Sequence, residues 1–223
     1  MHPGVASEIL RTLRRPNVVA AVVLTAAVAF TLLDRPVIHT VSDWPAAVLV
    51  VFTWITELGH SAKYLYASAA AFLVFRFVVR RPRWSRAGAL VFGAIVVPGV
   101  MINVLKVLFG RIRPHLLLEE QQWGFVPMTF DYDTSSMPSG HASTIFGLAL
   151  ALSVLFPRWR VLWFSLAAVV ALSRVITAAH YPSDVIVGAY IGLTFGAAWA
   201  TWLARRERVR GRRPAFAEAG ARD

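Results

Sequence analysis

Three short polar segments in an otherwise apolar chain combine residue types that could bind and attack a phosphate group. The first contains Lys106 and Arg113-Pro114, the second is Pro138-Ser139-Gly140-His141, and the third contains Ser173-Arg174, His180 and Asp184. Each lies at the end of a hydrophobic run, where an ionisable side chain is costly unless function requires it. Together they provide cations, two histidines and a carboxylate, which are the groups that a metal-free phosphoryl transfer needs.

The third segment contains a potential nucleophile. His180 and Asp184 are close enough in sequence for one turn to bring the carboxylate to one imidazole nitrogen. That contact would fix the tautomer and leave the other nitrogen free to attack phosphorus. Arg174 lies late in a hydrophobic run, where an arginine costs roughly 2.5–3.5 kcal/mol, so it should face the bundle interior or a watery cavity. The simpler alternative for His180 is a hydrogen-bonded histidine at a helix interface.

The second segment is typical of a helix start that binds an anion. Ser139 is a good N-cap, Gly140 allows close approach of the backbone, and free N–H groups at a helix N-terminus attract negative charge. An ordinary capped helix would account for Ser139 and Gly140. An ordinary capped helix would not account for His141, which could serve as a proton donor.

The first segment places two cations about two helical turns apart. If the helix that carries Lys106 continues past Gly110, the side chains of Lys106 and Arg113 leave the same face and could bind one phosphate dianion. The structural alternative is a pair of cations at a helix end that extend toward the membrane surface.

The composition is that of a membrane protein. Of the 223 residues, 57% are hydrophobic and only 16% are charged, and the mean hydropathy is +0.58. A soluble domain of this length does not need so much apolar surface. Cysteine is absent, so the chain has neither disulfides nor a thiol nucleophile.

Hydropathy predicts an all-α polytopic fold with six transmembrane helices and one short interfacial helix. The predicted spans are Asn17–Leu33, Tyr64–Val79, Ala87–Leu108, Ser139–Phe156, Val161–Ala179 and Val185–Leu203. The apolar stretch Trp44–Ile55 is too short to span a bilayer and begins at Pro45, so we interpret it as an interfacial or re-entrant helix.

The distribution of arginines predicts the orientation. With six spans, most of the 23 lysines and arginines fall on the side of the two termini, which the positive-inside rule makes cytoplasmic. The chain then divides into a basic cytoplasmic arm (1–16), a membrane domain (17–204) and a basic cytoplasmic tail (205–223). The net charge of +11 is mostly this topology signal, so we expect membrane lipids and not nucleic acid as partners.

At the three polar segments the sequence resembles the type 2 phosphatidic acid phosphatases, which are related to the vanadium haloperoxidases. The pattern of that family is Lys-x6-Arg-Pro, Pro-Ser-Gly-His and Ser-Arg-x5-His-x3-Asp, and this chain matches it without a substitution. The resemblance implies that His180 is transiently phosphorylated, that Asp184 supports it, and that His141 protonates the leaving group. It implies that the phosphoryl oxygens are bound by Lys106, Arg113, Ser139, Gly140 and Arg174.

The expected function is therefore hydrolysis of a lipid phosphomonoester or diphosphate at the outer side of a bacterial inner membrane, without a metal or other cofactor. The substrates that the resemblance implies are phosphatidic acid, phosphatidylglycerophosphate, undecaprenyl diphosphate and lipid A phosphate, and the sequence does not choose among them. The alternatives are a non-catalytic lipid-phosphate transporter or binding protein and a haloperoxidase-like enzyme. The sequence leaves open the roles of Arg111, Glu57 and His60, and the oligomeric state.

Overall fold

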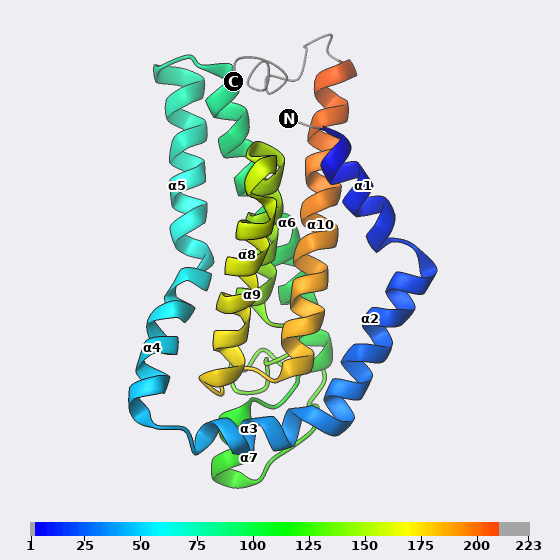
Figure 1. Ribbon diagram of the computed structural model, residues 1–223, viewed down its shortest axis with the longest axis vertical. Coiled ribbons are helices and arrows are strands. Elements are labelled where there is room, and N and C mark those ends of the chain that lie inside the picture. Colours follow the sequence, from blue (N-terminus) through cyan, green and yellow to red (C-terminus); the bar gives the residue numbers. More distant parts are fainter. Residues whose placement is uncertain (1–2, 210–223) are drawn as a thin grey trace.

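The computed structural model describes residues 3–209, and the fold of this part is all-helical, as predicted (Figure 1). Five helices run roughly along the long axis of the molecule. They are α5 (Ser61–Leu73), α6 (Pro82–Phe109), α8 (Gly140–Leu155), α9 (Arg160–Ile176) and α10 (Pro182–Val209). Because α6 and α9 end where α8 and α10 begin, four helix termini meet at the lower end of the bundle in Figure 1.

The remaining helices flank the bundle or cover this lower end. Helices α1 (Pro3–Leu13) and α2 (Pro16–Val28) pack against α10, and a π-helical segment η1 (Ala29–Leu33) joins α2 to α3 (Asp34–Ser42). Helices α3 and α7 (Pro114–Glu120) lie across the lower end. Short elements complete the chain: α4 (Ala46–Thr56), η2 (Glu57–Gly59), η3 (Val74–Val78) and η4 (Pro157–Trp159).

Four helical segments of the described part are long and apolar enough to cross a bilayer. They are Pro16–Ser42, Pro82–Phe109, Pro157–Ile176 and Pro182–Glu207, and α8 is a shorter apolar helix. Large apolar side chains on α2 face outward, with Val23 62% and Leu24 65% exposed, as a lipid-covered surface requires. The prediction of six spans further needs α8 and the α5–η3 helix to cross the membrane, and this part stays a prediction.

The predicted interfacial stretch forms α4, which begins at Ala46 after Pro45. The first predicted span is longer than expected, because the helix continues through η1 and Pro36 to Ser42. A π-helical turn shifts the hydrogen-bond ladder just before Pro36, which accommodates a residue without an N–H group. Part of the predicted basic arm is ordered as α1, whose Ala6 is buried in the core. Most of the predicted tail 205–223 lies outside the described residues.

Small residues set the distance between the central helices. One core cluster joins α1, α6, α8 and α10 through alanines such as Ala94, Ala151 and Ala200. At Gly188 of α10, an added Cβ would collide with the backbone of Ser139. Such small residues let helices in a membrane approach closely. The start of α8 is thereby held directly beside the first turns of α10.

Candidate active site

All eight residues predicted for the site lie at the lower end of the bundle, where the four helix termini meet. Lys106 is in the last turn of α6, and Arg174 is in the last turn of α9. Arg113 is the N-cap of α7, Ser139–His141 begin α8, and His180 and Asp184 flank the start of α10. The tertiary fold therefore brings together three segments that are separated in sequence.

From the sequence, Lys106 and Arg113 share one helix face only if the helix that carries Lys106 continues past Gly110. That helix does not continue to Arg113. Helix α6 ends at Phe109, because Gly110 adopts the left-handed conformation (φ 59°) of a C-cap. The two cations nevertheless converge on one backbone carbonyl. Lys106 Nζ donates to the oxygen of Ser135 at 2.9 Å, and Arg113 Nη2 donates to it at 3.4 Å. The long loop before α8, and not a shared helix face, holds this pair of cations.

The predicted N-cap at Ser139 is confirmed. Ser139 Oγ accepts a hydrogen bond from the N–H of Ala142 at 3.4 Å. The N–H of Ser139 in turn donates to the backbone oxygen of Asp184 at 3.0 Å. This bond, together with the close approach at Gly188, fixes the N-terminus of α8 against the segment that carries Asp184. The first N–H groups of α8 are thus positioned to receive an anion.

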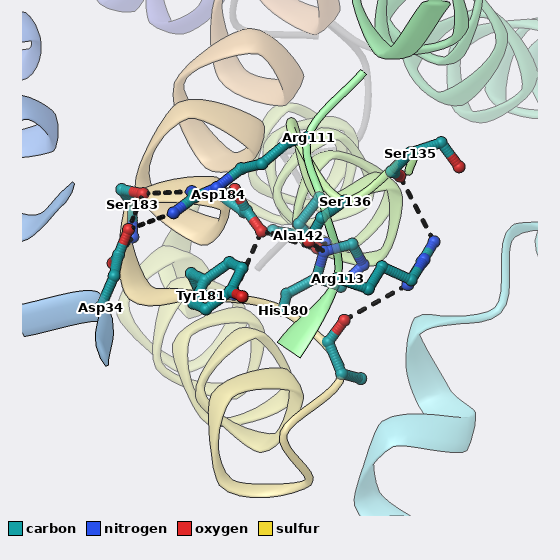
Figure 2. Close-up of polar contacts among 12 residues, drawn as sticks. Asp34, Arg111, Arg113, Ser135, Ser136, Ala142, His180, Tyr181, Ser183 and Asp184 are labelled. Atoms are coloured by element: carbon teal, nitrogen blue, oxygen red, sulfur yellow. Dashed lines mark hydrogen bonds and ion pairs between the residues drawn. The ribbon is translucent and has the colours of Figure 1, made fainter. Parts of the chain in front are cut away.

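His180 and Asp184 form the predicted pair in a fully buried environment (Figure 2). His180 Nδ1 lies 3.5 Å from Asp184 Oδ2. Ser136, which the sequence did not single out, lies between them: its Oγ donates to Asp184 Oδ2 at 2.6 Å and is 3.4 Å from His180 Nδ1. The N–H of Tyr181 donates to the same carboxylate oxygen at 3.1 Å. Asp184 is therefore held at several points and can orient the imidazole.

Burial determines the charge of His180. Because the imidazole is removed from water, its pKa falls from 6.5 to about 4, although the adjacent Asp184 acts in the opposite direction. The ring is therefore neutral near pH 7. A neutral imidazole whose Nδ1 faces a carboxylate and hydroxyl has a lone pair at Nε2, as a nucleophile requires.

His141 and Arg174 contribute buried donors to the same region. His141 Nε2 and Arg174 Nε are buried and make no hydrogen bond within the described residues. Arg174 Nη1 donates to Thr56 Oγ1 at 2.9 Å, which ties α9 to the end of α4. A cavity of about 370 Å³ is lined by Lys106, Gly140 and His141. Unpaired buried polar atoms beside a cavity are candidates for ligand contacts.

Two of the residues whose roles the sequence left open lie beside this cavity. His60 lines it, and the rings of His60 and His141 meet edge to face with centroids 4.7 Å apart. Glu57 Oε1 is 3.3 Å from His60 Nε2, and Glu57 Oε2 accepts a hydrogen bond from Lys63 at 2.9 Å. Among residues 3–209, no cluster of three or more potential metal ligands was found.

Arg111 is the most important residue that the sequence interpretation left without a role. It is 1% exposed and lies between two fully buried carboxylates. Its Nη1 donates to Asp184 Oδ1 at 2.5 Å and to Ser183 Oγ at 2.6 Å, while its Nη2 donates to Asp34 Oδ2 at 2.6 Å. Figure 2 shows this bridge from Asp34 on α3 to Asp184 on α10. The guanidinium thus holds the outer oxygen of the carboxylate that contacts His180.

Aromatic rings enclose the same guanidinium. Its central carbon lies 4.1 Å from the ring centroid of Tyr181, 5.0 Å from that of Phe30 and 5.1 Å from that of Trp123.

A signal for Asp34 was present in the sequence, since it is an acid placed directly after a hydrophobic run, where charge is expensive. No local pattern connects it to Arg111, which is remote in sequence.

Comparison with known proteins agrees with this geometry. A family model described as the PAP2 superfamily matches residues 87–208, which is more than half of the chain. The chain belongs to the PAP2 superfamily. The family resemblance of the three motifs is thereby confirmed, and this PAP2 protein is a membrane-bound phosphatase.

Relatives and solved structures support the assignment. Lipid A 1-phosphatase of Rhizobium johnstonii is 33% identical over 195 residues, covering 82% of this chain and 79% of that protein. Undecaprenyl-diphosphatase of Sulfolobus acidocaldarius is 31% identical over 42% of this chain and 48% of that protein. The crystal structure of Aquifex aeolicus LpxE has a TM-score of 0.57 at 24% identity and covers 75% of this chain and 94% of that one. A PAP2-type phosphatidylglycerolphosphate phosphatase from Bacillus subtilis has a TM-score of 0.52 at 20% identity, covering 93% and 94%.

Proposed function

We propose that this PAP2 protein hydrolyses the phosphate or diphosphate group of a membrane lipid through a phosphohistidine intermediate. The observation that carries the proposal is the buried His180–Asp184 pair, which leaves His180 Nε2 without a hydrogen bond among residues 3–209. A lipid-phosphate transporter or binding protein would use the surrounding cations. It would have no need for an oriented, neutral imidazole.

In the first step, His180 Nε2 attacks phosphorus while the bond from phosphorus to the leaving oxygen breaks. His141, which enters this step as an imidazolium, gives its proton to that oxygen and becomes a neutral imidazole, so the lipid leaves as a neutral alcohol or as a protonated lipid phosphate. The phosphorylated imidazole carries positive charge, which Asp184 stabilises through Nδ1. Ser136 and Arg111 keep the Asp184 carboxylate in place during this step.

In the second step, a water molecule loses a proton to His141 while its oxygen attacks phosphorus. The nitrogen–phosphorus bond breaks, inorganic phosphate leaves, and both histidines return to their starting states. Lys106, Arg113 and Arg174, with the N–H groups at the start of α8, would neutralise charge on the phosphoryl oxygens throughout. Donors already in position lower the barrier without reorganisation.

A lipid substrate suits the cavity beside His141. Its polar end is formed by Lys106, His141 and Asn103, whereas apolar side chains such as Ile95 and Val100 line its flank. Such a cavity can receive a phosphate and the adjoining hydrocarbon. Lipid A 1-phosphate is the first substrate to test, because two lipid A 1-phosphatases match this chain over most of its length. Phosphatidic acid, phosphatidylglycerophosphate and undecaprenyl diphosphate complete the panel.

We further propose that the chain crosses a bacterial inner membrane six times, with the site facing outward. The support is the concentration of arginines around the start of α6 and near the end of α10, for example Arg80, Arg83 and Arg206, because these helix ends lie opposite the site. In this arrangement the active site would meet phosphorylated lipids of the outer leaflet.

The decisive experiment measures phosphate release from the four lipids by the purified protein in detergent, with EDTA present. His180→Ala should abolish turnover, whereas His39→Ala, which changes an exposed histidine on α3, should leave it unchanged. Rapid quenching should trap an acid-labile phosphoenzyme in the unmodified protein only. Binding of all four lipids without hydrolysis would favour the transporter, and turnover by His180→Ala would overturn the proposed nucleophile.

A further inference from the structure

A second and larger cavity lies at the end of the bundle opposite the active site. Its volume is about 740 Å³, and it lies between the α5–η3 helix, the start of α6 and the end of α10. In Figure 1 these ends of α5, α6 and α10 lie at the top, whereas the helix termini that carry the site residues lie at the bottom. Among its lining residues are Arg76, Arg80, Arg86, Arg206, Phe75 and Trp202. We refer to it as the arginine pocket.

The arginine pocket carries an excess of positive charge. Four arginines line it, and Glu207 is the single acid among its described lining residues. That acid faces one of the four cations, with Glu207 Oε1 3.1 Å from Arg86 Nε. Arg76, Arg80 and Arg206 therefore provide the charge that could bind an anion. Arginine is well suited to phosphate because its planar fork can donate two parallel hydrogen bonds.

The backbone at Arg80 gives an independent indication. Arg80 has a φ of 54°, which is left-handed, and it directly follows Val79, the C-cap of η3. The N–H of Arg81 donates to the oxygen of Phe75 at 2.9 Å, which closes the helix end around Arg80. Glycine is the usual residue at such a helix end, and a residue with a Cβ costs about 1 kcal/mol more. An arginine that lines a cavity and adopts this strained conformation suggests a functional requirement for arginine at this position.

The walls of the arginine pocket suit an amphiphile. The guanidinium of Arg206 lies 4.4 Å from the ring centroid of Trp202, and that of Arg76 lies 5.4 Å from the centroid of Phe77. Trp202 is 42% exposed and Phe77 is 62% exposed. Tryptophan and arginine together are characteristic of the headgroup level of a membrane. Phe72 and Leu203 extend the lining with apolar surface suitable for an acyl chain.

We propose that the arginine pocket binds the phosphate headgroup of an anionic phospholipid from the leaflet at that end of the bundle. The charge, the aromatic walls and the position between helices favour a lipid over a soluble anion. The volume lies within the range of about 300–1,000 Å³ that is typical of ligand sites. Basic pockets between membrane helices bind anionic headgroups by this chemistry. A bound lipid would link α5, α6 and α10, and the site is separate from that of phosphoryl transfer.

The test measures thermal unfolding of the full-length protein in a neutral detergent with added lipid. Phosphatidylglycerol should raise the unfolding temperature, whereas phosphatidylcholine and inorganic phosphate at the same concentration should raise it much less. In the double variant Arg76→Gln/Arg206→Gln, the affinity for phosphatidylglycerol should fall by about tenfold or more. Arg160→Gln is the matched control, because Arg160 is an exposed arginine at the same end but outside the pocket.

Arg80→Gly separates binding from folding. Glycine relieves the left-handed backbone, so this variant should be at least as stable as the unmodified protein without lipid. It should nevertheless gain less from phosphatidylglycerol. An equal effect of phosphatidylcholine, or full phosphatidylglycerol stabilisation in both pocket variants, would overturn the proposal. Stabilisation by inorganic phosphate that matches the lipid would replace it with a site for a soluble anion.

Discussion

Replacing Arg111 with methionine would leave two fully buried carboxylates without their shared cation. Arg111 lies 2.6 Å from Asp34 Oδ2 and 2.5 Å from Asp184 Oδ1, and all three side chains are almost completely removed from water. Methionine is similar in length, so the substitution removes charge without a large cavity. Loss of one partner from a buried ion pair costs about 3–5 kcal/mol. In a chain of this size we expect the unfolding temperature to fall by roughly 6–20 °C.

The lysine variant tests orientation separately from charge. A guanidinium uses two nitrogens to reach Asp34 and Asp184 at once, whereas a single ammonium cannot reproduce that geometry. Arg111→Lys should therefore fold, but it should hold Asp184 less firmly against His180. Loss of such a supporting contact typically lowers activity about 10–100-fold. Because Arg111 does not line the cavity beside His141, we expect the loss in kcat with little change in KM.

The assays are thermal unfolding in detergent and steady-state hydrolysis of the best lipid substrate. Arg35→Met provides the matched control, because Arg35 neighbours Asp34 in sequence but is exposed, and its loss should alter stability by less than about 1 kcal/mol. In the double variant Asp34→Asn/Arg111→Met, the losses of stability from the two substitutions should be less than additive. Each single variant leaves a buried charge at the other position without its partner, whereas the double variant removes both charges of this pair. Normal kcat and stability in Arg111→Lys would refute the positioning role. A raised KM with normal kcat would indicate that Arg111 binds substrate.

Four further outcomes are expected. His141→Ala should lose about 10²–10⁴-fold of its lipid phosphatase activity but recover on an aryl phosphate, whose leaving group needs no proton, whereas His180→Ala should recover on neither. Equal losses of His141→Ala on both substrates would make His141 a phosphate ligand. Because the pKa of His180 is about 4 when folded and near 6.5 when unfolded, the unfolded state binds the extra proton between these values. Stability should thus be complete above pH 6.5 and fall by about 2 kcal/mol by pH 5, and His180→Asn should remove this part of the pH dependence. Cysteines introduced at Gln122 and Arg83 should react from opposite sides of the membrane, and reaction of both from outside would refute the proposed orientation. Activity should persist in EDTA, whereas a loss reversed by Mg²⁺ would contradict the histidine mechanism.

Local features of the site were predictable from the sequence because they depend on residues that are near one another along the chain. Ser139 caps α8 as its residue type and position indicate, and the four-residue spacing of His180 and Asp184 suffices for their contact. Long apolar runs predicted the helices for the same reason, since a bilayer demands continuous hydrophobic length. The family resemblance was also readable from the motifs without a structure, and the superfamily match confirms that resemblance.

The tertiary structure decided how the charges are paired. Lys106 and Arg113 meet at the Ser135 carbonyl because Gly110 ends the helix between them, which a helical extrapolation could not show. Asp34 and Arg111 are remote in sequence, and their contact requires α3 to cross the end of the bundle. The hydropathy profile shows that a charged residue lies beside an apolar run. Only the packing of helices that are remote in sequence determines which partner neutralises that charge. For this protein, the sequence determined the chemical groups and their helices, and the fold determined which buried cation holds Asp184 against His180.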